Sequence, residues 1–291
     1  MLQVARLAPK QLGESRDLVA AFLRERLNPD GGFQDRAGAS DLYYTVFGLE
    51  GLVALQEPVP ADVVAAFLSR FGDGEGLDLV HLASLARCWS LVSRHRTGVP
   101  AAGILERLAR FRAHDGGYAQ APGASESTVY ASFLAFGAHQ DLGAEVPDPA
   151  RVLAALGRLR ARDGGYANRA EDAFGITTVT AAAVMLYRAL DHPVEPHLGM
   201  WLLDRCHASG GFLAAPAAPI PDLLSTATAL HALAALHAPL AGVQDACLDF
   251  VDSLWTNRGG FYGTWADDVL DCEYTYYGLL ALGHLTLAAP E

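Results

Sequence analysis

The chain has 291 residues, a formal net charge of −12 and 51% hydrophobic residues. This charge argues against nucleic acid or an anionic membrane surface as a general partner. No apolar run of about 20 residues is present, so we expect no membrane span, and the first residues lack the pattern of a signal peptide. The four cysteines stand singly in apolar segments, which favours reduced thiols and a cytoplasmic protein.

The first predicted unit follows a lead-in at residues 1–14. An amphipathic helix runs from about Ser15 to Leu27, where the segment Asn28-Pro29-Asp30-Gly31-Gly32 ends it. A second helix, apolar almost all round, then runs from Asp41 to about Leu55. The two helices and the Gly-Gly-aromatic turn between them form one unit.

This unit recurs along the chain. Gly-Gly-aromatic turns stand again at residues 116–118, 164–166, 210–212 and 259–261, and the first glycines of successive turns are 85, 48, 46 and 49 residues apart. The spacing of 85 is close to two periods, so we interpret the segment around Asp78 as a copy that lacks the glycine pair. Such a period is typical of repeat proteins, whose units bury their apolar faces against one another.

The repeats predict a single all-α domain over residues 1–291. Helices with one polar face form an outer ring that faces water, and the apolar helices form an inner ring. Six helix pairs then close into an α6/α6 toroid with a central cavity, which is the default place for a ligand. The six repeats are expected at about 15–55, 61–93, 101–139, 149–190, 195–238 and 242–288. Their apolar helices are expected to begin near Asp41, Asp78, Ser125, Asp172, Asp222 and Asp271.

Each part of the repeated motif has a physical role. Paired glycines allow a tight turn with positive φ, and the aromatic residue after them fills the gap between units. An acidic residue before each apolar helix is suited to cap free N–H groups at the start of the helix. A small residue in each apolar helix is expected to let neighbouring helices pack closely; these residues are Gly48, Ala131, Ala181, Ala229 and Gly278.

The same helices supply the candidate site residues. Residues three and six or seven positions after the acidic residue share its face of the helix, so we expect an aromatic wall below a rim of carboxylates. The candidate substrate-binding residues are Asp41, Tyr44, Phe47, Glu126, Tyr130, Thr228, Tyr274 and Tyr277. Aromatic faces suit an isoprenoid and stabilise a carbocation. Asp172, Asp222 and Asp271 are the candidate acid, base or metal-binding residues, and Asp222 and Asp271 with Cys272 form a candidate metal site.

Structural roles compete with each of these assignments. An aspartate at a helix start is more often a cap than a catalyst. The tyrosines fit core packing as well as a cavity wall, and His81 and His231 fit buried core histidines. Cys272 fits an inert buried thiol.

The turns, the period and the two helix types resemble the prenyltransferase and squalene-cyclase repeat family, over roughly residues 15–288. The segments closest to β subunits of protein prenyltransferases are 123–133, 221–233 and 270–282. The resemblance implies an isoprenoid substrate, and a helical partner subunit or a homodimer.

The residues that such transferases use are mostly replaced. The family holds zinc with an Asp, a Cys and a His; Asp222 matches the first, but Leu224 and Tyr274 occupy the other two positions, so zinc is not expected. The diphosphate ligands fall on Thr128, Pro216, Pro219 and Ser225, and the acidic DxDD motif of squalene cyclases is absent. Mg²⁺ held by carboxylates is the candidate cofactor.

Three functions are compatible with these observations. The first is a prenyltransferase-like or terpene-cyclase-like enzyme that acts on an isoprenoid without the usual zinc site. The second is a non-catalytic toroid that binds a lipid or a protein. The third is an α/α toroid that acts on carbohydrate with paired carboxylates. Fold alone does not decide among them.

Overall fold

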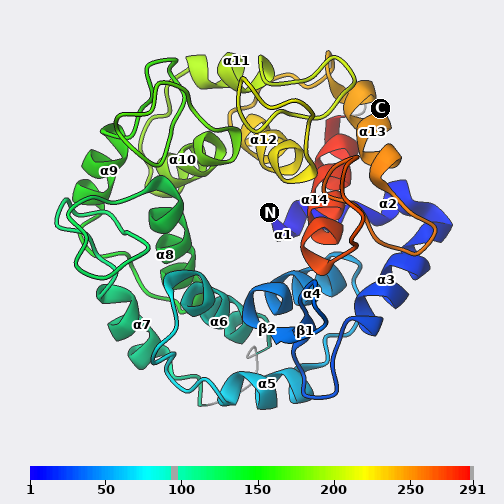
Figure 1. The fold of residues 1–291 in the computed structure, drawn as a ribbon, viewed down its shortest axis with the longest axis horizontal. Helices are drawn as coiled ribbons and strands as arrows, with labels where there is room; N and C mark the ends of the chain where they lie inside the picture. Colours follow the sequence, from blue (N-terminus) through cyan, green and yellow to red (C-terminus); the bar gives the residue numbers. More distant parts are fainter. Residues whose placement is uncertain (93–97, 289–291) are drawn as a thin grey trace.

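The structure is a computed structural model, and it describes residues 1–92 and 98–288. The predicted end of the second repeat at residue 93, and the last three residues of the predicted domain, lie outside the described residues. Figure 1 shows an inner and an outer layer of helices arranged as a closed ring around a common axis.

The described part of the chain alternates between helices of the two layers. The outer helices are α3 (Arg16–Glu25), α5 (Ala61–Ser69), α7 (Ala101–Ala109), α9 (Pro149–Gly157), α11 (His197–Leu203) and α13 (Gln244–Leu254). The inner helices are α4 (Leu42–Ala54), α6 (Leu79–Val92), α8 (Val129–Asp141), α10 (Thr177–Ala189), α12 (Leu223–Ala235) and α14 (Cys272–Ala288). Each inner helix packs against the next, and α14 packs against α4, which closes the ring. The predicted all-α toroid is confirmed.

The hydrophobic core lies between the two layers. Outer helix α3 buries Val19, Phe22 and Leu23 on one face, while Arg24 on its other face reaches solvent. Inner helix α4 buries nine of its thirteen residues, because it is covered by α3 on one side and by its inner neighbours on two others. This difference in burial is the physical reason for the two helix types that the sequence distinguishes.

The Gly-Gly-aromatic turns connect outer to inner helices by a shared set of contacts. In each turn the backbone N–H of the aromatic residue donates to a hydroxyl on the following inner helix. These pairs are Phe33 to Thr45, Tyr118 to Ser132, Tyr166 to Thr180, Phe212 to Thr226 and Phe261 to Thr275. This threonine or serine hydroxyl therefore fixes the turn onto its own inner helix.

Two of the small residues of the motif lie against the aromatic residue of the turn. A Cβ atom at Gly48 would overlap the ring of Phe33, and one at Gly278 would lie 2.8 Å from the ring of Phe261. These two glycines therefore make room for the aromatic residue of their own unit. The first turn also contains a short antiparallel pair, β1 (Phe33–Gln34) and β2 (Ser40–Asp41), with Phe33 opposite Asp41.

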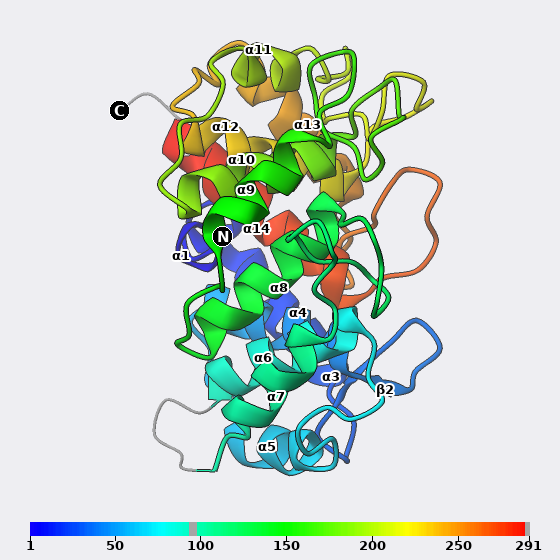
Figure 2. The same cartoon turned by 90° about the vertical axis from the view of Figure 1, so that its left-hand side faces the viewer.

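The lead-in forms structure of its own, which the sequence did not predict. It contains α1 (Leu2–Ala5), α2 (Pro9–Leu12) and a 3-10 turn (Gly13–Ser15). Helix α1 lies inside the ring, where it packs against α14 and α4 (Figure 1). Figure 2 places α1 on one side of the ring, whereas the loops around β2 project from the other side. Among the described residues, no helix combines the length and the apolar character that crossing a bilayer requires.

Candidate functional site

Three of the predicted carboxylates cap the inner helices. Asp41, Asp222 and Asp271 each accept a hydrogen bond from the backbone N–H three residues later, at distances of 3.0, 2.7 and 2.8 Å. Their second oxygens are also engaged: by His81 for Asp41, by the Ser225 hydroxyl for Asp222, and by Arg36 for Asp271. The capping alternative is therefore what the geometry shows for these three side chains.

The other two predicted acidic residues are not helix caps. Helix α8 is capped by Thr128, and Glu126 is exposed in the loop before it. Helix α10 begins at Thr177, five residues after Asp172, which lies in the preceding loop. The helix starts predicted near residues 125 and 172 are therefore too early. Two aspartates of the turns explain the later starts. Asp115 accepts a hydrogen bond from the backbone N–H of Ser127, and Asp163 accepts one from that of Gly175, so both residues stay in the loops.

The inner ring encloses a cavity of about 340 Å³. Seven aromatic side chains line it, contributed by three inner helices: Tyr43, Phe47, Tyr130, Phe133, Phe136, Tyr276 and Tyr277. Of the eight candidate substrate-binding residues, Phe47, Tyr130 and Tyr277 are in this set, and the other five are not among the lining residues. The candidate catalytic and metal-binding residues Asp172, Asp222, Asp271 and Cys272 do not line the cavity either.

On each inner helix, the residues that line the cavity stand about one sequence position away from the residues that were predicted to line it. Counted from the cap Asp41, the α4 residues that line the cavity are two, five, six and nine positions later: Tyr43, Val46, Phe47 and Glu50. In α6, counted from Asp78, the same positions are Val80, Ala83, Ser84 and Arg87, which also line the cavity. The residue three positions after the cap lies instead at the rim, as Tyr44 and Tyr274 do; the Tyr274 ring is covered by Arg36. Thr228 donates to the backbone carbonyl of Leu224.

Glu273 is a carboxyl that the sequence interpretation missed. It stands on α14 one turn before the cavity-lining Tyr277, and the Tyr43 hydroxyl donates to its Oε1 at 2.5 Å. Burial raises the pKa of Glu273 to about 7, against the opposing effect of the Tyr43 hydrogen bond. A carboxyl group with this pKa is a usable proton donor near neutral pH. Its position two residues after the cap Asp271 is the signal that identifies it in retrospect.

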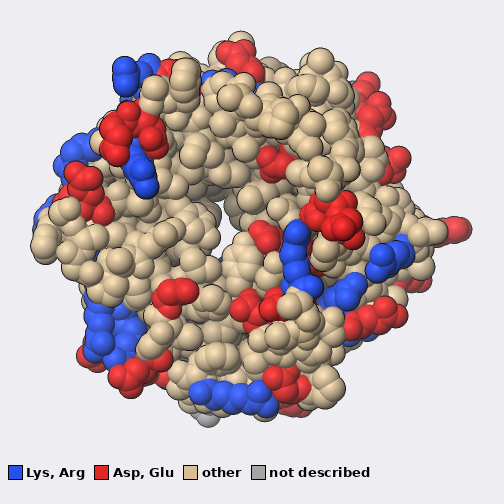
Figure 3. All heavy atoms as spheres, viewed as in Figure 1, with Lys and Arg blue, Asp and Glu red and all other residues tan. Residues whose placement is uncertain are grey.

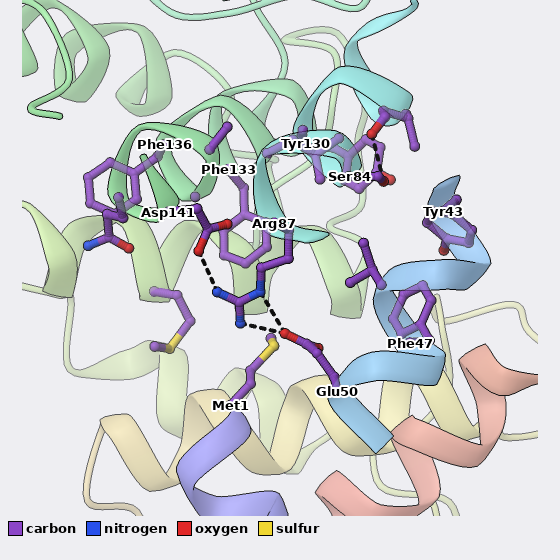
Figure 4. A pocket seen from close by; sticks show the side chains of 18 of the residues that line it. Met1, Tyr43, Phe47, Glu50, Ser84, Arg87, Tyr130, Phe133, Phe136 and Asp141 are labelled. Carbon is purple, nitrogen blue, oxygen red and sulfur yellow. Dashed lines mark hydrogen bonds and ion pairs between the residues drawn. The ribbon is translucent and has the colours of Figure 1, made fainter. Parts of the chain in front are cut away.

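A second missed feature is a charged cluster in the cavity wall. Arg87 donates to Glu50 through Nε at 2.6 Å and to Asp141 through Nη1 at 2.6 Å. Figure 4 shows the guanidinium between the two carboxylates, with Met1 beside them. The three charged residues come from α4, α6 and α8, so the cluster ties three successive inner helices together.

The rim of the ring is mainly acidic. Figure 3 shows acidic side chains around the central opening. Arg36, from the β1–β2 loop, pairs with Asp271 at 2.8 Å and with Asp267 at 2.9 Å. His81 bridges Asp78 and Asp41, at 2.9 and 3.1 Å. Burial alone would lower the pKa of His81, but its two carboxylate partners raise it. His81 is therefore a rim residue and not a core histidine.

The donor set does not fit the family's zinc site. The resemblance puts the three zinc-ligand positions at Asp222, Leu224 and Tyr274, and of these side chains only the Asp222 carboxylate is a usual zinc ligand. Across residues 1–92 and 98–288, no group of three or more His, Cys, Asp or Glu side chains is placed to hold a metal ion. Burial raises the pKa of the Cys272 thiol, which disfavours the thiolate that a metal would bind.

His231 is the one predicted core histidine that borders the cavity. Its Nδ1 lies 3.0 Å from Nε2 of His284 on α14. Burial lowers the pKa of His231 to about 3 and that of His284 to about 4, so both rings are neutral at physiological pH.

Comparison with known proteins places the fold. The family model of the prenyltransferase alpha-alpha toroid domain matches residues 9–81 and 175–288. No curated protein matches the chain. A variant of the type II terpene cyclase MstE from Scytonema, in complex with geranylgeranyl dihydroxybenzoate as substrate, is 13% identical; the match covers 97% of this chain and 98% of that one, with a TM-score of 0.64.

Two further solved structures share the architecture. Protein geranylgeranyltransferase-I from Candida albicans, complexed with GGPP, is 15% identical over 98% of this chain and 81% of that one, with a TM-score of 0.52. A glycosidase variant is 14% identical over 99% of both chains, with a TM-score of 0.57. At these identities the likeness is one of fold, and it includes the carbohydrate-active alternative as well as the isoprenoid one.

Proposed function

The chain belongs to the prenyltransferase alpha-alpha toroid family, and we propose that it is an enzyme that binds an isoprenoid in the inner-ring cavity and acts on it. The observation that carries the proposal is the cavity itself. Its volume of about 340 Å³ lies within the range of roughly 300–1,000 Å³ that is typical of ligand pockets. Its aromatic wall offers apolar surface to a prenyl chain and π faces to a positive charge.

We place Glu273 as the proton donor of this enzyme. Its pKa of about 7 keeps a large fraction protonated at neutral pH. Glu273 is not itself one of the lining residues, but it is hydrogen-bonded to the cavity-lining Tyr43 and stands one helical turn before Tyr277, so it reaches the cavity through this wall. In the proposed step the O–H bond breaks and the proton adds to an alkene carbon of the isoprenoid. The alkene π pair forms the new C–H bond, which leaves a carbocation beside the aromatic wall.

The rest of the reaction needs no further reactant. An internal alkene attacks the carbocation and forms a C–C bond, and loss of a proton to water gives a product isomeric with the substrate. Solvent then protonates Glu273 again. Asp222 and Asp271 hold their helices and the rim in place, because each has both oxygens engaged in hydrogen bonds.

Incubation with geranylgeraniol and with geranylgeranyl diphosphate in D₂O, followed by mass spectrometry, tests the proposal. Alkene protonation places one deuterium in a cyclised product. Glu273→Gln is expected to lower the rate by about 10²-fold or more, as expected for loss of a general acid. Glu145→Gln, at an exposed loop carboxylate, is the matched control and is expected to leave the rate unchanged.

The alternatives give different results in the same assay. Binding without conversion indicates a lipid-binding toroid, and oligosaccharide binding without affinity for prenyl chains indicates the carbohydrate-active alternative. Addition of Mg²⁺ tests the metal dependence predicted from the carboxylates. A helical partner subunit or a homodimer also stays a prediction, which light scattering of the purified protein checks.

A further inference from the structure

The Glu50–Arg87–Asp141 cluster has unused hydrogen-bond donors on the cavity side. A guanidinium carries five N–H groups. The Nε–H and one N–H of Nη2 point to Glu50, and one N–H of Nη1 points to Asp141. Among the described residues no other acceptor contacts Arg87, and the side chain lines the cavity. One N–H on each Nη is therefore available to an oxygen atom of a ligand.

The net charge of the cluster determines whether a charged or an uncharged oxygen atom of a ligand can bind there. Two carboxylates, 6% and 10% exposed, face one guanidinium that is 34% exposed. Arg87 is the only Lys or Arg among the described residues that line the cavity, and the bordering His231 is neutral. Burial lowers the pKa of the nearby Met1 α-amino group, which is therefore largely neutral at pH 8.5. An anion placed here meets a net negative cluster.

The other end of the ring is no better suited to an anion. Asp41 and Asp222 cap their helices there, and the Glu273 carboxyl accepts a hydrogen bond from Tyr43. The cation of that end is Arg36, which is already shared between Asp267 and Asp271. An allylic diphosphate requires several uncompensated cations or a metal site. Arg36 and Arg87 are each paired with two carboxylates, and the described residues contain no group of three or more His, Cys, Asp or Glu side chains placed to hold a metal ion.

We propose that the Glu50–Arg87–Asp141 cluster binds an uncharged oxygen, such as a hydroxyl, ether or carbonyl, so that the substrate is an uncharged oxygen-bearing isoprenoid and not a prenyl diphosphate. This inference rests on the proposed function and adds its substrate class. The aromatic wall takes the prenyl chain, while Arg87 fixes the polar end of the substrate. Arg87 is thus a specificity-determining residue.

Binding of two probes with the same chain tests the inference. Titration calorimetry at pH 8.5 compares farnesol with farnesyl diphosphate, each with and without Mg²⁺. The wild-type protein is expected to bind farnesol at least tenfold more tightly than the diphosphate under both conditions. Tighter binding of farnesyl diphosphate, alone or with Mg²⁺, would overturn the proposal.

Neutralising the two carboxylates provides a gain-of-affinity test that a folding defect cannot mimic. Glu50→Gln with Asp141→Asn changes the cluster charge from −1 to +1, and is expected to raise the affinity for farnesyl diphosphate at least tenfold while changing that for farnesol less than threefold. The single variants are expected to lie between. Asp73→Asn, which neutralises the partner of Arg107 outside the cavity, is the control.

The two levels of the proposal fail in different ways. An unchanged ratio of the two affinities in the double variant would overturn the role of the cluster, whereas binding of farnesol by the wild type would still support an isoprenoid site. Absence of binding by both probes would overturn the isoprenoid function itself, and with it this inference.

Discussion

Glu273 combines two properties that a buried carboxyl rarely has together in a structural role. It has a single hydrogen-bond donor, Tyr43, and it lies where burial disfavours its charged form. Burial also raises the pKa of the cap Asp271, two residues earlier, but there a backbone N–H and Arg36 both oppose the rise. A carboxyl that is left mainly to desolvation is the one whose proton is retained near neutral pH.

The stability of the protein is expected to show this proton directly. The folded-state pKa of about 7 lies above the unfolded value of 4.5. The folded state therefore binds the proton more tightly, and its stability falls as pH rises from 4.5 through 7. Glu273→Gln removes this dependence. Above pH 8 the variant is expected to be more stable than wild type by up to about 3 kcal/mol, with little difference near pH 4.5.

Urea unfolding at both pH values measures this difference. Glu126→Gln, at an exposed site, serves as the control and is expected to follow the wild type at each pH. A Glu273→Gln variant with the same stability relative to wild type at pH 4.5 and 8.5 would show that the carboxyl is ionised as an ordinary glutamate is.

The candidate residues could be predicted in part, because helix periodicity fixes a stripe but not its exact rotation. A helix turns by about 100° per residue, so a one-residue error in counting from the cap exchanges the cavity face for the rim. This is why Phe47, Tyr130 and Tyr277 were found whereas Tyr43 and Glu273 were missed. The partners Glu50 and Arg87 lie 37 residues apart in the sequence, and no local pattern joins them.

At the scale of the elements, the turns connect each unit to the next outer helix. Gly210 has a φ of 81°, and a Cβ atom there would overlap the backbone carbonyl of Ala246 on α13. Gly38, in the first turn loop, has a similar φ of 89°, but nothing lies within 4 Å of its Cβ position. Substitution of Gly38 therefore probes only the free-energy cost of a positive φ, whereas substitution of Gly210 adds the cost of the close contact with α13.

Substitution of these two glycines by alanine measures the contact. Gly38→Ala is expected to lose about 1 kcal/mol of unfolding free energy, from the positive φ alone. Gly210→Ala is expected to lose at least roughly 2 kcal/mol more, because backbone of α13 has to move away. Denaturant unfolding gives both values. An equal loss of unfolding free energy in the two variants would mean that the backbone of α13 moves away from the turn at no cost in stability.

The inner and outer helices could be told apart in the sequence because the outer ones have a polar face and the inner ones are apolar almost all round. The residues at which the helices begin depend on tertiary contacts. The starts of α8 and α10 were misplaced because Asp115 and Asp163, from the turns, accept hydrogen bonds from backbone N–H groups of Ser127 and Gly175 in the loops before those helices. The role of the inner-helix hydroxyls was also hidden: the hydrogen bond from Phe212 to Thr226 spans 14 residues. The local sequence around the turn does not reveal the acceptor of such a bond.

At the scale of the whole molecule, the ring was predictable from the repeat period, but its interior was not. The lead-in carries no copy of the motif, and yet α1 lies inside the ring against α14 and α4. It brings Met1 to the cavity next to Arg87 and Glu50, so the N-terminal segment forms part of the candidate site. Helix α1 is too short to hold this position by its own helical stability, and its contacts must do so.

Gly283 provides the closest of these contacts. It lies on α14, and a Cβ atom there would overlap the backbone carbonyl of Val4 on α1. Gly157 on outer helix α9 is a helical glycine with nothing within 4 Å of its Cβ position. Gly157→Ala is expected to stabilise the protein by up to about 1 kcal/mol, through helix propensity alone. Gly283→Ala gains the same propensity but has to displace α1.

Hydrogen exchange distinguishes the two variants. In Gly283→Ala, amides of residues 2–8 are expected to exchange about tenfold faster, which corresponds to roughly 1.4 kcal/mol of local opening, while amides of α12 keep their wild-type rates. Because Met1 leaves the cavity with α1, the affinity for farnesol is expected to fall in parallel. Unchanged exchange of residues 2–8 would mean that α1 is held by its contacts with α4, and that the close approach to α14 is dispensable for its position.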